Sequence, residues 1–108
     1  MALPPLDPTR DALREHVLRH SLKRGEFTLK SGATSTWFLD TKQTACRPDG
    51  LLLMAEVALA MIPDDATAIG GITVGADPVA YAVAAVAATR GRALKSFTIR
   101  KEAKDHGM

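Results

Sequence analysis

The sequence predicts an α/β fold in which an N-terminal helix and β-hairpin hood precede an incomplete parallel-sheet core. Capping and turn residues within residues 1–46 outline one helix and two short strands. Within residues 47–100 the order is helix, strand, glycine-rich turn, helix and strand, which is typical of a βαβ unit. The 108 residues, 46% of them hydrophobic, fit one domain or part of one.

The N-terminal elements follow from capping and turn chemistry. Asp7-Pro8 predicts the start of a helix over residues 8–24, and Gly25 is its expected stop. Residues 26–30 and 36–40 are strand-like, and a run of Ser, Gly, Ala and Thr separates them. We therefore expect these two runs to pair as a hairpin.

The second half predicts a single crossover unit. Its elements are a helix from Pro48 to Pro63, a buried strand over 66–69, a turn at Gly70-Gly71, a helix over 77–90 capped by Asp77-Pro78, and a strand over 93–100. The two strands of such a unit run parallel. Because two parallel strands cannot cover both faces and edges of a sheet, we interpret the chain as an α/β domain cut before its sheet is complete.

Charge and composition restrict the possible functions. The net charge is +2, and the four basic and two acidic residues from Lys95 onward account for all of it. A near-neutral body argues against broad nucleic-acid binding, and a local basic cluster favours a small anion. No apolar run reaches the roughly 18 residues of a membrane span, and no secretory signal is expected. Cys46 alone makes no internal disulfide, so we expect a reducing cytoplasm.

Residues 70–77, Gly-Gly-Ile-Thr-Val-Gly-Ala-Asp, are the first candidate for chemistry. They lie between the end of a strand and the start of a helix, where backbone N–H groups attract phosphate. The alternative is a plain βα turn with Asp77 as the helix cap. The run lacks the spacing of a dinucleotide-binding fingerprint or of a P-loop.

Residues 100–107 are the second candidate. Arg100 offers a planar donor fork, and Lys101 and Lys104 are point charges suited to phosphate oxygens. His106 can donate a hydrogen bond or move a proton. The alternative is a solvated loop of mixed charge.

The third candidate is the hairpin. Trp37 and Phe38 are neighbours and point to opposite faces of a strand, so one can enter the core while the other meets a ligand. Lys30 stands nearby, and an aromatic face beside a lysine suits a flat anionic ring. The alternative is ordinary hairpin packing with a surface lysine.

Other polar residues favour simpler interpretations. Asp64-Asp65 is expected to form a turn. His16 and His20 lie one helical turn apart without a third candidate ligand beside them, so metal binding there is weakly supported. Cys46 has no local sign of activation.

In this order, the three segments resemble those of orotate phosphoribosyltransferases. The matching stretches are Phe27-Thr28-Leu29-Lys30-Ser31-Gly32 with Ser35-Thr36-Trp37-Phe38-Leu39-Asp40, then residues 71–78, then Phe97-Thr98-Ile99-Arg100-Lys101-Glu102-Ala103-Lys104-Asp105-His106-Gly107. The last stretch is the most specific. Together they span nearly the whole chain, but only about the first half of the family's pattern.

The resemblance implies transfer of a phosphoribosyl group from phosphoribosyl pyrophosphate to orotate, with Mg²⁺, by a homodimer with shared active sites. It implies that Lys30 reaches the ligands at the base end and that Trp37 and Phe38 border the orotate ring. It also implies that the turn Thr73–Ala76, with Thr73, Val74 and Gly75 as binding residues, is the pyrophosphate loop, and that Arg100, Lys101, Lys104 and His106 bind pyrophosphate. Of these, Lys104 and His106 are the expected catalytic residues, and no residue is expected to bind a metal. Residues 101–108 would then begin a mobile catalytic loop.

The chain departs from the family pattern at two places. Gly75 stands where some members carry a lysine. The family's ribose-phosphate signature, two acidic residues and a Thr/Gly-rich loop after a strand, has no match, and Asp64-Asp65 lacks that loop. We therefore expect a chain truncated at residue 108 to be inactive alone. The alternatives are a catalytically dead ligand-binding or dimerisation module and a phosphoribosyltransferase for another base.

Overall fold

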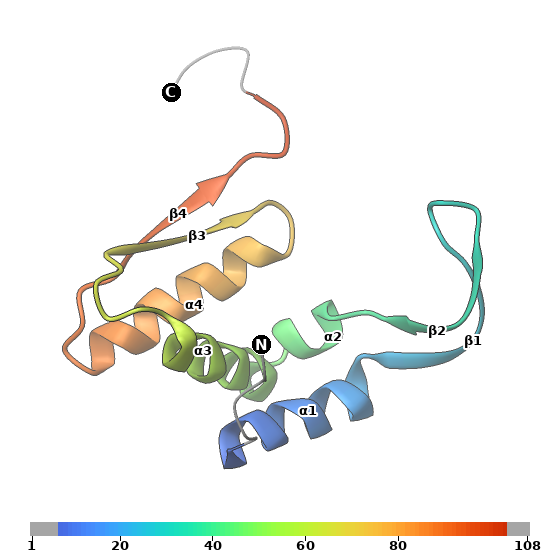
Figure 1. Cartoon of the computed structure of the whole chain (residues 1–108), viewed down its shortest axis with the longest axis horizontal. Helices are drawn as coiled ribbons and strands as arrows, with labels where there is room; N and C mark the ends of the chain where they lie inside the picture. Colours follow the sequence, from blue (N-terminus) through green and yellow to red (C-terminus); the bar gives the residue numbers. More distant parts are fainter. Residues whose placement is uncertain (1–6, 104–108) are drawn as a thin grey trace. The chain divides into compact units, whose positions relative to one another are not determined.

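The computed structural model describes residues 7–103, which fall into two compact units (Figure 1). The N-terminal unit extends to Leu53 and the C-terminal unit begins at Met54, so the boundary falls inside a helix. In chain order the elements are α1 (Pro8–His20), β1 (Leu22–Thr28), β2 (Thr34–Leu39), α2 (Lys42–Ala45), α3 (Pro48–Met61), β3 (Ala68–Ile72), α4 (Ala76–Thr89) and β4 (Lys95–Ile99). No helix among these residues is long and apolar enough to cross a membrane.

Helix α1 begins as the sequence predicts and ends earlier. The Asp7 carboxylate accepts a hydrogen bond from the backbone N–H of Arg10 at 2.8 Å, with proline in the first turn. The helix ends at His20 and the chain becomes extended from Leu22, so the predicted extension to residue 24 is wrong. Gly25 does not stop a helix. It lies inside β1, where the strand register shifts.

Strands β1 and β2 form the predicted antiparallel hairpin, with pairs running from Leu22–Leu39 to Thr28–Thr34. Both strands begin before their predicted starts, because cross-strand pairing extends the ribbon beyond the most strand-like residues. Figure 1 shows the short helix α2 following β2, an element that the sequence analysis did not predict.

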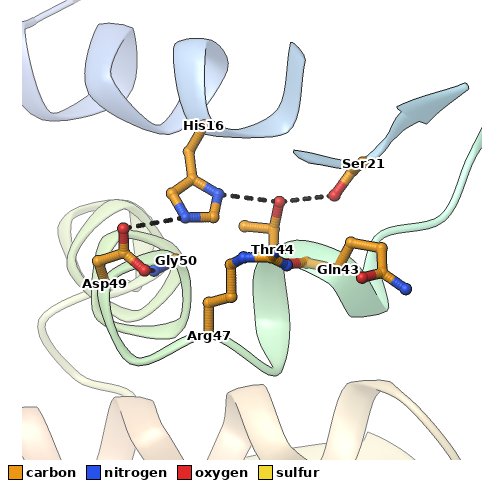
Figure 2. A network of polar contacts seen from close by, with 7 residues as sticks. All are labelled: His16, Ser21, Gln43, Thr44, Arg47, Asp49 and Gly50. Atoms are coloured by element: carbon orange, nitrogen blue, oxygen red, sulfur yellow. Dashed lines mark hydrogen bonds and ion pairs between the residues drawn. The ribbon is translucent and has the colours of Figure 1, made fainter. Parts of the chain in front are cut away.

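A chain of four polar side chains, which we call the His16 relay, ties the N-terminal unit together (Figure 2). His16 of α1 lies between two partners: its Nε2 is 3.2 Å from a carboxylate oxygen of Asp49, and its Nδ1 is 3.2 Å from Oγ1 of Thr44. The same Thr44 oxygen lies 2.6 Å from Oγ of Ser21. The neighbouring imidazole lowers the pKa of the Asp49 carboxyl below its ordinary value. The relay therefore joins the start of α3 to α1, α2 and the root of β1.

In the C-terminal unit, β3 and β4 pair in parallel, in register from Ala68–Lys95 to Ile72–Ile99, as predicted. Helix α4 connects them and contacts both (Figure 1). Its Val83 and Ala87 form the buried core with Ala55 and Leu94.

Two predicted boundaries in this unit are wrong. Gly70 and Gly71 lie within β3 and not in the turn after it, because the parallel pairing continues to Ile72. Helix α4 begins at Ala76, and Asp77 does not cap it from outside. The Asp77 carboxylate instead accepts from the backbone N–H of Gly75 at 3.1 Å.

The helix stop at Gly91 and the turn at Asp64-Asp65 agree with prediction. Gly91 has φ +76°, a left-handed conformation that glycine adopts without a steric penalty. Arg92 then donates to the backbone oxygens of Pro63 and Ala66 at 2.8 and 3.3 Å. This side chain links the loop after α4 to the turn before β3.

Gly50→Ala should destabilise the chain. A Cβ at this buried position would lie 2.2 Å from the backbone oxygen of Thr44 and 2.7 Å from Cε1 of His16. Because a backbone atom cannot easily move aside, we expect a loss of about 1–3 kcal/mol in the free energy of unfolding. Urea unfolding followed by circular dichroism measures it, with Ala60→Ser at an exposed position of α3 as the control. Equal midpoints for the two variants would contradict this account of the packing.

Candidate functional site

The carboxyl ends of β3 and β4 lie at one edge of the C-terminal unit, because parallel strands end on the same side. Thr73 follows β3, and its N–H donates to the backbone oxygen of Ile99 at 2.9 Å. Arg100 and Lys101 follow β4, and the N–H of Lys101 lies 3.4 Å from Oγ1 of Thr73. Open α/β sheets bind ligands at this edge.

A pocket of about 370 Å³ opens at this edge, lined by Thr73, Arg100, Lys101 and Glu102. It brings together two cations, one hydroxyl and one carboxylate. The Nε of Arg100 donates a hydrogen bond to the backbone oxygen of Glu102 at 3.3 Å. This bond restricts the orientation of the Arg100 guanidinium group. The terminal nitrogens of Arg100 and the ammonium of Lys101 are the donors suited to oxyanions.

The turn beside the pocket depends on close packing of backbone. Gly71 is buried, and a Cβ there would lie 2.4 Å from the carbonyl carbon and oxygen of Ala76. Gly75 has φ +131°, which L side chains rarely adopt. The peptide bond between Thr73 and Val74 is cis.

Of the three residues predicted for this turn, only Thr73 lines the pocket. Val74 is 93% exposed and is not among the residues that line the pocket. The N–H of Gly75 is already engaged by the Asp77 carboxylate. The predicted role of this turn therefore depends mainly on the Thr73 hydroxyl, which the sequence analysis did not single out from its neighbours.

The hairpin carries the other predicted residues, in the N-terminal unit. Lys30 is exposed in the turn between β1 and β2. Trp37 and Phe38 are neighbours on β2, and both are exposed, so the expectation that one of them enters the core is wrong. They are 51% and 43% exposed, and Phe38 packs against Phe27 with ring centroids 5.9 Å apart.

A second pocket of about 350 Å³ lies along the hairpin, and the sequence analysis missed it. Its lining residues are Glu26, Phe27, Thr28, Thr34, Ser35 and Thr36. None of the predicted hairpin residues lines it. The only sequence feature that could have indicated this pocket is the high density of Ser and Thr residues on both strands. The strand-register shift between Arg24 and Phe27, which only the folded chain shows, lies beside it.

Two predicted catalytic residues, Lys104 and His106, lie outside the described residues. Within the described range, no three histidine, cysteine, aspartate or glutamate side chains gather as metal ligands.

The chain is similar to known proteins over nearly its whole length. Orotate phosphoribosyltransferase from Nostoc is 38% identical over 98 residues, which are 91% of this chain and 48% of that protein. The protein of the same name from Aquifex aeolicus is 37% identical over 103 residues, which cover 92% of this chain and 56% of the relative. No protein-family model matches the chain.

Solved structures agree with these relatives. Mycobacterium tuberculosis orotate phosphoribosyltransferase in complex with Fe(III) dicitrate matches with a TM-score of 0.76 and 35% identity, over 93% of this chain and 56% of that one. The same protein in complex with 5-phospho-α-D-ribosyl 1-diphosphate matches with a TM-score of 0.70 and 32% identity, over 91% and 58%. The chain thus spans about half the length of these relatives, and over that span it is similar to the N-terminal part of orotate phosphoribosyltransferases.

Proposed function

We propose that this chain provides the diphosphate-binding part of an enzyme that transfers the phosphoribosyl group of phosphoribosyl pyrophosphate to orotate, giving orotidine 5′-phosphate and pyrophosphate. The pocket formed by Thr73, Arg100 and Lys101 at the carboxyl ends of β3 and β4 is the observation that carries the proposal. The relatives support it by their name, and one of the similar structures holds the diphosphate substrate.

Charge at the pocket suits this reaction. Breaking the bond between ribose and diphosphate places positive charge on the sugar and negative charge on the leaving group. Donors that are already in place and strengthen as this charge develops lower the barrier. Arg100 and Lys101 are such donors for the leaving diphosphate, and the hydroxyl of Thr73 adds a neutral one. Lys104 and His106 stay predicted as further catalytic residues of the same segment.

The hairpin is the proposed orotate end. Orotate is a flat ring with a carboxylate, and Lys30 with Trp37 and Phe38 offers a cation and aromatic surface of matching chemistry. Lys30 lies in the hairpin turn, and Trp37 and Phe38 lie on β2. An adenine, hypoxanthine or uracil ring lacks the carboxylate that Lys30 would bind.

Mg²⁺ is proposed as the metal of the reaction, and it would neutralise charge on the diphosphate. Mg²⁺ is often held by one or two carboxylates together with substrate phosphates and water. Glu102 is the carboxylate at this pocket, and no larger ligand cluster occurs among residues 7–103. The residues present therefore fit a metal that arrives with the diphosphate. A homodimer with shared sites and a cytoplasmic location stay predictions.

Removing the pocket cations should weaken binding of pyrophosphate and of phosphoribosyl pyrophosphate. Because a hydrogen bond to a charged group contributes roughly 1.5–3 kcal/mol, Arg100→Ala and Lys101→Ala should each raise Kd by about tenfold or more. Isothermal titration calorimetry on the 108-residue chain measures this. Lys95→Ala, at the opposite end of β4, is the matched control and should change Kd little. An equal increase of Kd in Lys95→Ala and in Lys101→Ala would mean that the ligand is attracted nonspecifically by positive charge.

Gly71→Ala should disturb the same pocket through the backbone. The added methyl group would meet Ala76 at 2.4 Å and push the start of α4 away from β3, so the turn carrying Thr73 would move. We expect weaker pyrophosphate binding together with a lower thermal midpoint. Ala68→Ser, exposed on the same strand, is the control. A stable Gly71→Ala variant with unchanged Kd would show that the turn is not part of the site.

Activity is best tested in a chimaera. Joining this chain to the C-terminal half of the Mycobacterium tuberculosis relative should give orotate-dependent release of pyrophosphate, and Arg100→Ala should reduce its kcat/KM by at least about tenfold. Thermal shifts with orotate, adenine, hypoxanthine and uracil test the choice of base. A folded chimaera that turns over another base overturns the orotate assignment. Tight ligand binding without turnover favours a catalytically dead binding module.

A further inference from the structure

The His16 relay has no part in the diphosphate pocket or in the proposed orotate face. Ser21 and Thr44 are completely buried and His16 is 8% exposed, whereas the Asp49 side chain at the other end is 69% exposed. Figure 2 shows His16 between the carboxylate of Asp49 and the hydroxyl of Thr44, with Ser21 beyond it. The relay therefore runs from the surface into the interior of the N-terminal unit.

The chemistry of its partners assigns a direction to the relay. Nε2 of His16 lies 3.2 Å from the Asp49 carboxylate without an aligned hydrogen bond. Because an ionised carboxylate only accepts hydrogen bonds, we take Nε2 to carry the proton of neutral His16. Its Nδ1 is then an acceptor, and the Thr44 hydroxyl must donate to it. The remaining lone pairs of Thr44 accept from the Ser21 hydroxyl. In this arrangement each buried hydroxyl proton has an acceptor.

Protonation of His16 reverses the relay. Both ring nitrogens then donate, so Nδ1 donates to the Thr44 hydroxyl oxygen and can no longer accept the Thr44 proton. Thr44 and Ser21 are the only residues shown bonding to these two hydroxyls besides His16 within the described part of the chain, so one of the two hydroxyl protons is left without an acceptor. A buried donor without an acceptor is unfavourable. The exposed Asp49 carboxylate offers limited compensation, because solvent weakens an ion pair at the surface.

The interior end of the relay lies at the root of the hairpin. The backbone N–H of Ser21 donates to Val17 at 2.8 Å, and its carbonyl accepts from the N–H of Asp40 at 2.9 Å. The next residue, Leu22, forms the first pair of the hairpin with Leu39. A change at Ser21 therefore acts on the end of α1 and on both strands where they meet.

We propose that His16 is a positioning residue whose neutral form holds the root of the hairpin, and that its protonation on acidification loosens the hairpin. The inference concerns the N-terminal unit alone and does not depend on the proposed function.

Several charged or titratable groups face His16. The His20 ring lies 4.5 Å from it between centroids on α1, and Asp49 faces it from α3. Arg47, between α2 and α3, and Arg19 act electrostatically on His20, whose pKa is lowered first by burial and then by Arg47 and His16.

The tautomer of His16 is the most direct test. Nitrogen NMR shifts of the imidazole in the 108-residue chain at pH 8 should identify Nδ1 as the unprotonated nitrogen. Finding the proton on Nδ1 overturns the assigned direction of the relay. Because this measurement needs no substitution, it does not depend on whether a variant folds.

Hydrogen exchange at the Asp40 amide tests the coupling to the hairpin. After correction for intrinsic exchange, its protection factor should fall at least about tenfold between pH 8 and pH 5, while the Lys95 amide, bonded to Thr67 at 3.0 Å, should not change in parallel. Trp37, the single tryptophan, provides a parallel fluorescence readout on β2. Pyrophosphate binding is an independent measurement, so failure of this inference and failure of the proposed function are distinguishable.

Two matched pairs of variants separate positioning from simple packing. His16→Asn keeps a side-chain acceptor without a titrating group, so it should retain protection at pH 8 and lose the pH dependence, whereas His16→Leu should lose both. Thr44→Ser keeps the hydroxyl and should behave as the parent chain. Thr44→Val should lower protection at pH 8 and remove the pH dependence. Unchanged pH dependence in His16→Asn or in Thr44→Val overturns the proposal.

Discussion

The hydrogen bond from the Thr73 N–H to the backbone oxygen of Ile99, 2.9 Å long, closes the parallel sheet at the edge on which the site depends. Since β3 and β4 pair in register up to Ile72–Ile99, the residues that follow each strand emerge side by side. A hydroxyl from one segment and cations from the other, more than 20 residues apart in sequence, thereby line one pocket. An antiparallel arrangement would place these segments at opposite ends of the strands.

Small residues make that edge possible. Gly71 allows the first turn of α4 to approach β3, and Val83 and Ala87 pack the helix into the core with Leu94. The turn between β3 and α4 offers little positive charge to an anion. Gly75 has no side chain, and the backbone N–H of Gly75 already donates to the Asp77 carboxylate. The cations that line the pocket, Arg100 and Lys101, come instead from the residues after β4.

Sequence patterns predicted element types better than element ends. The cap at Asp7, the hairpin and the parallel crossover all follow from local residue chemistry, and they are confirmed. The end of α1 is different. The Ser21 carbonyl accepts from the N–H of Asp40, just after β2, its hydroxyl bonds to Thr44 of α2, and the chain is extended from Leu22, before Gly25. From sequence, His16 and His20 were considered only as possible metal ligands, with weak support. The folded chain instead directs His16 to Thr44 and Asp49, residues 28 and 33 positions away, which no helical spacing reveals.

The sequence by itself determined the α/β class, the order of the elements and the segment that carries the cations, because capping residues, strand-forming runs and local charge act over a few neighbouring positions. Only tertiary structure decided that Thr73, and not Val74 or Gly75, lines the pocket with Arg100. It also decided the partners of His16. Both outcomes depend on strand register and on close backbone approach, and these are set by packing between segments that are distant in the chain.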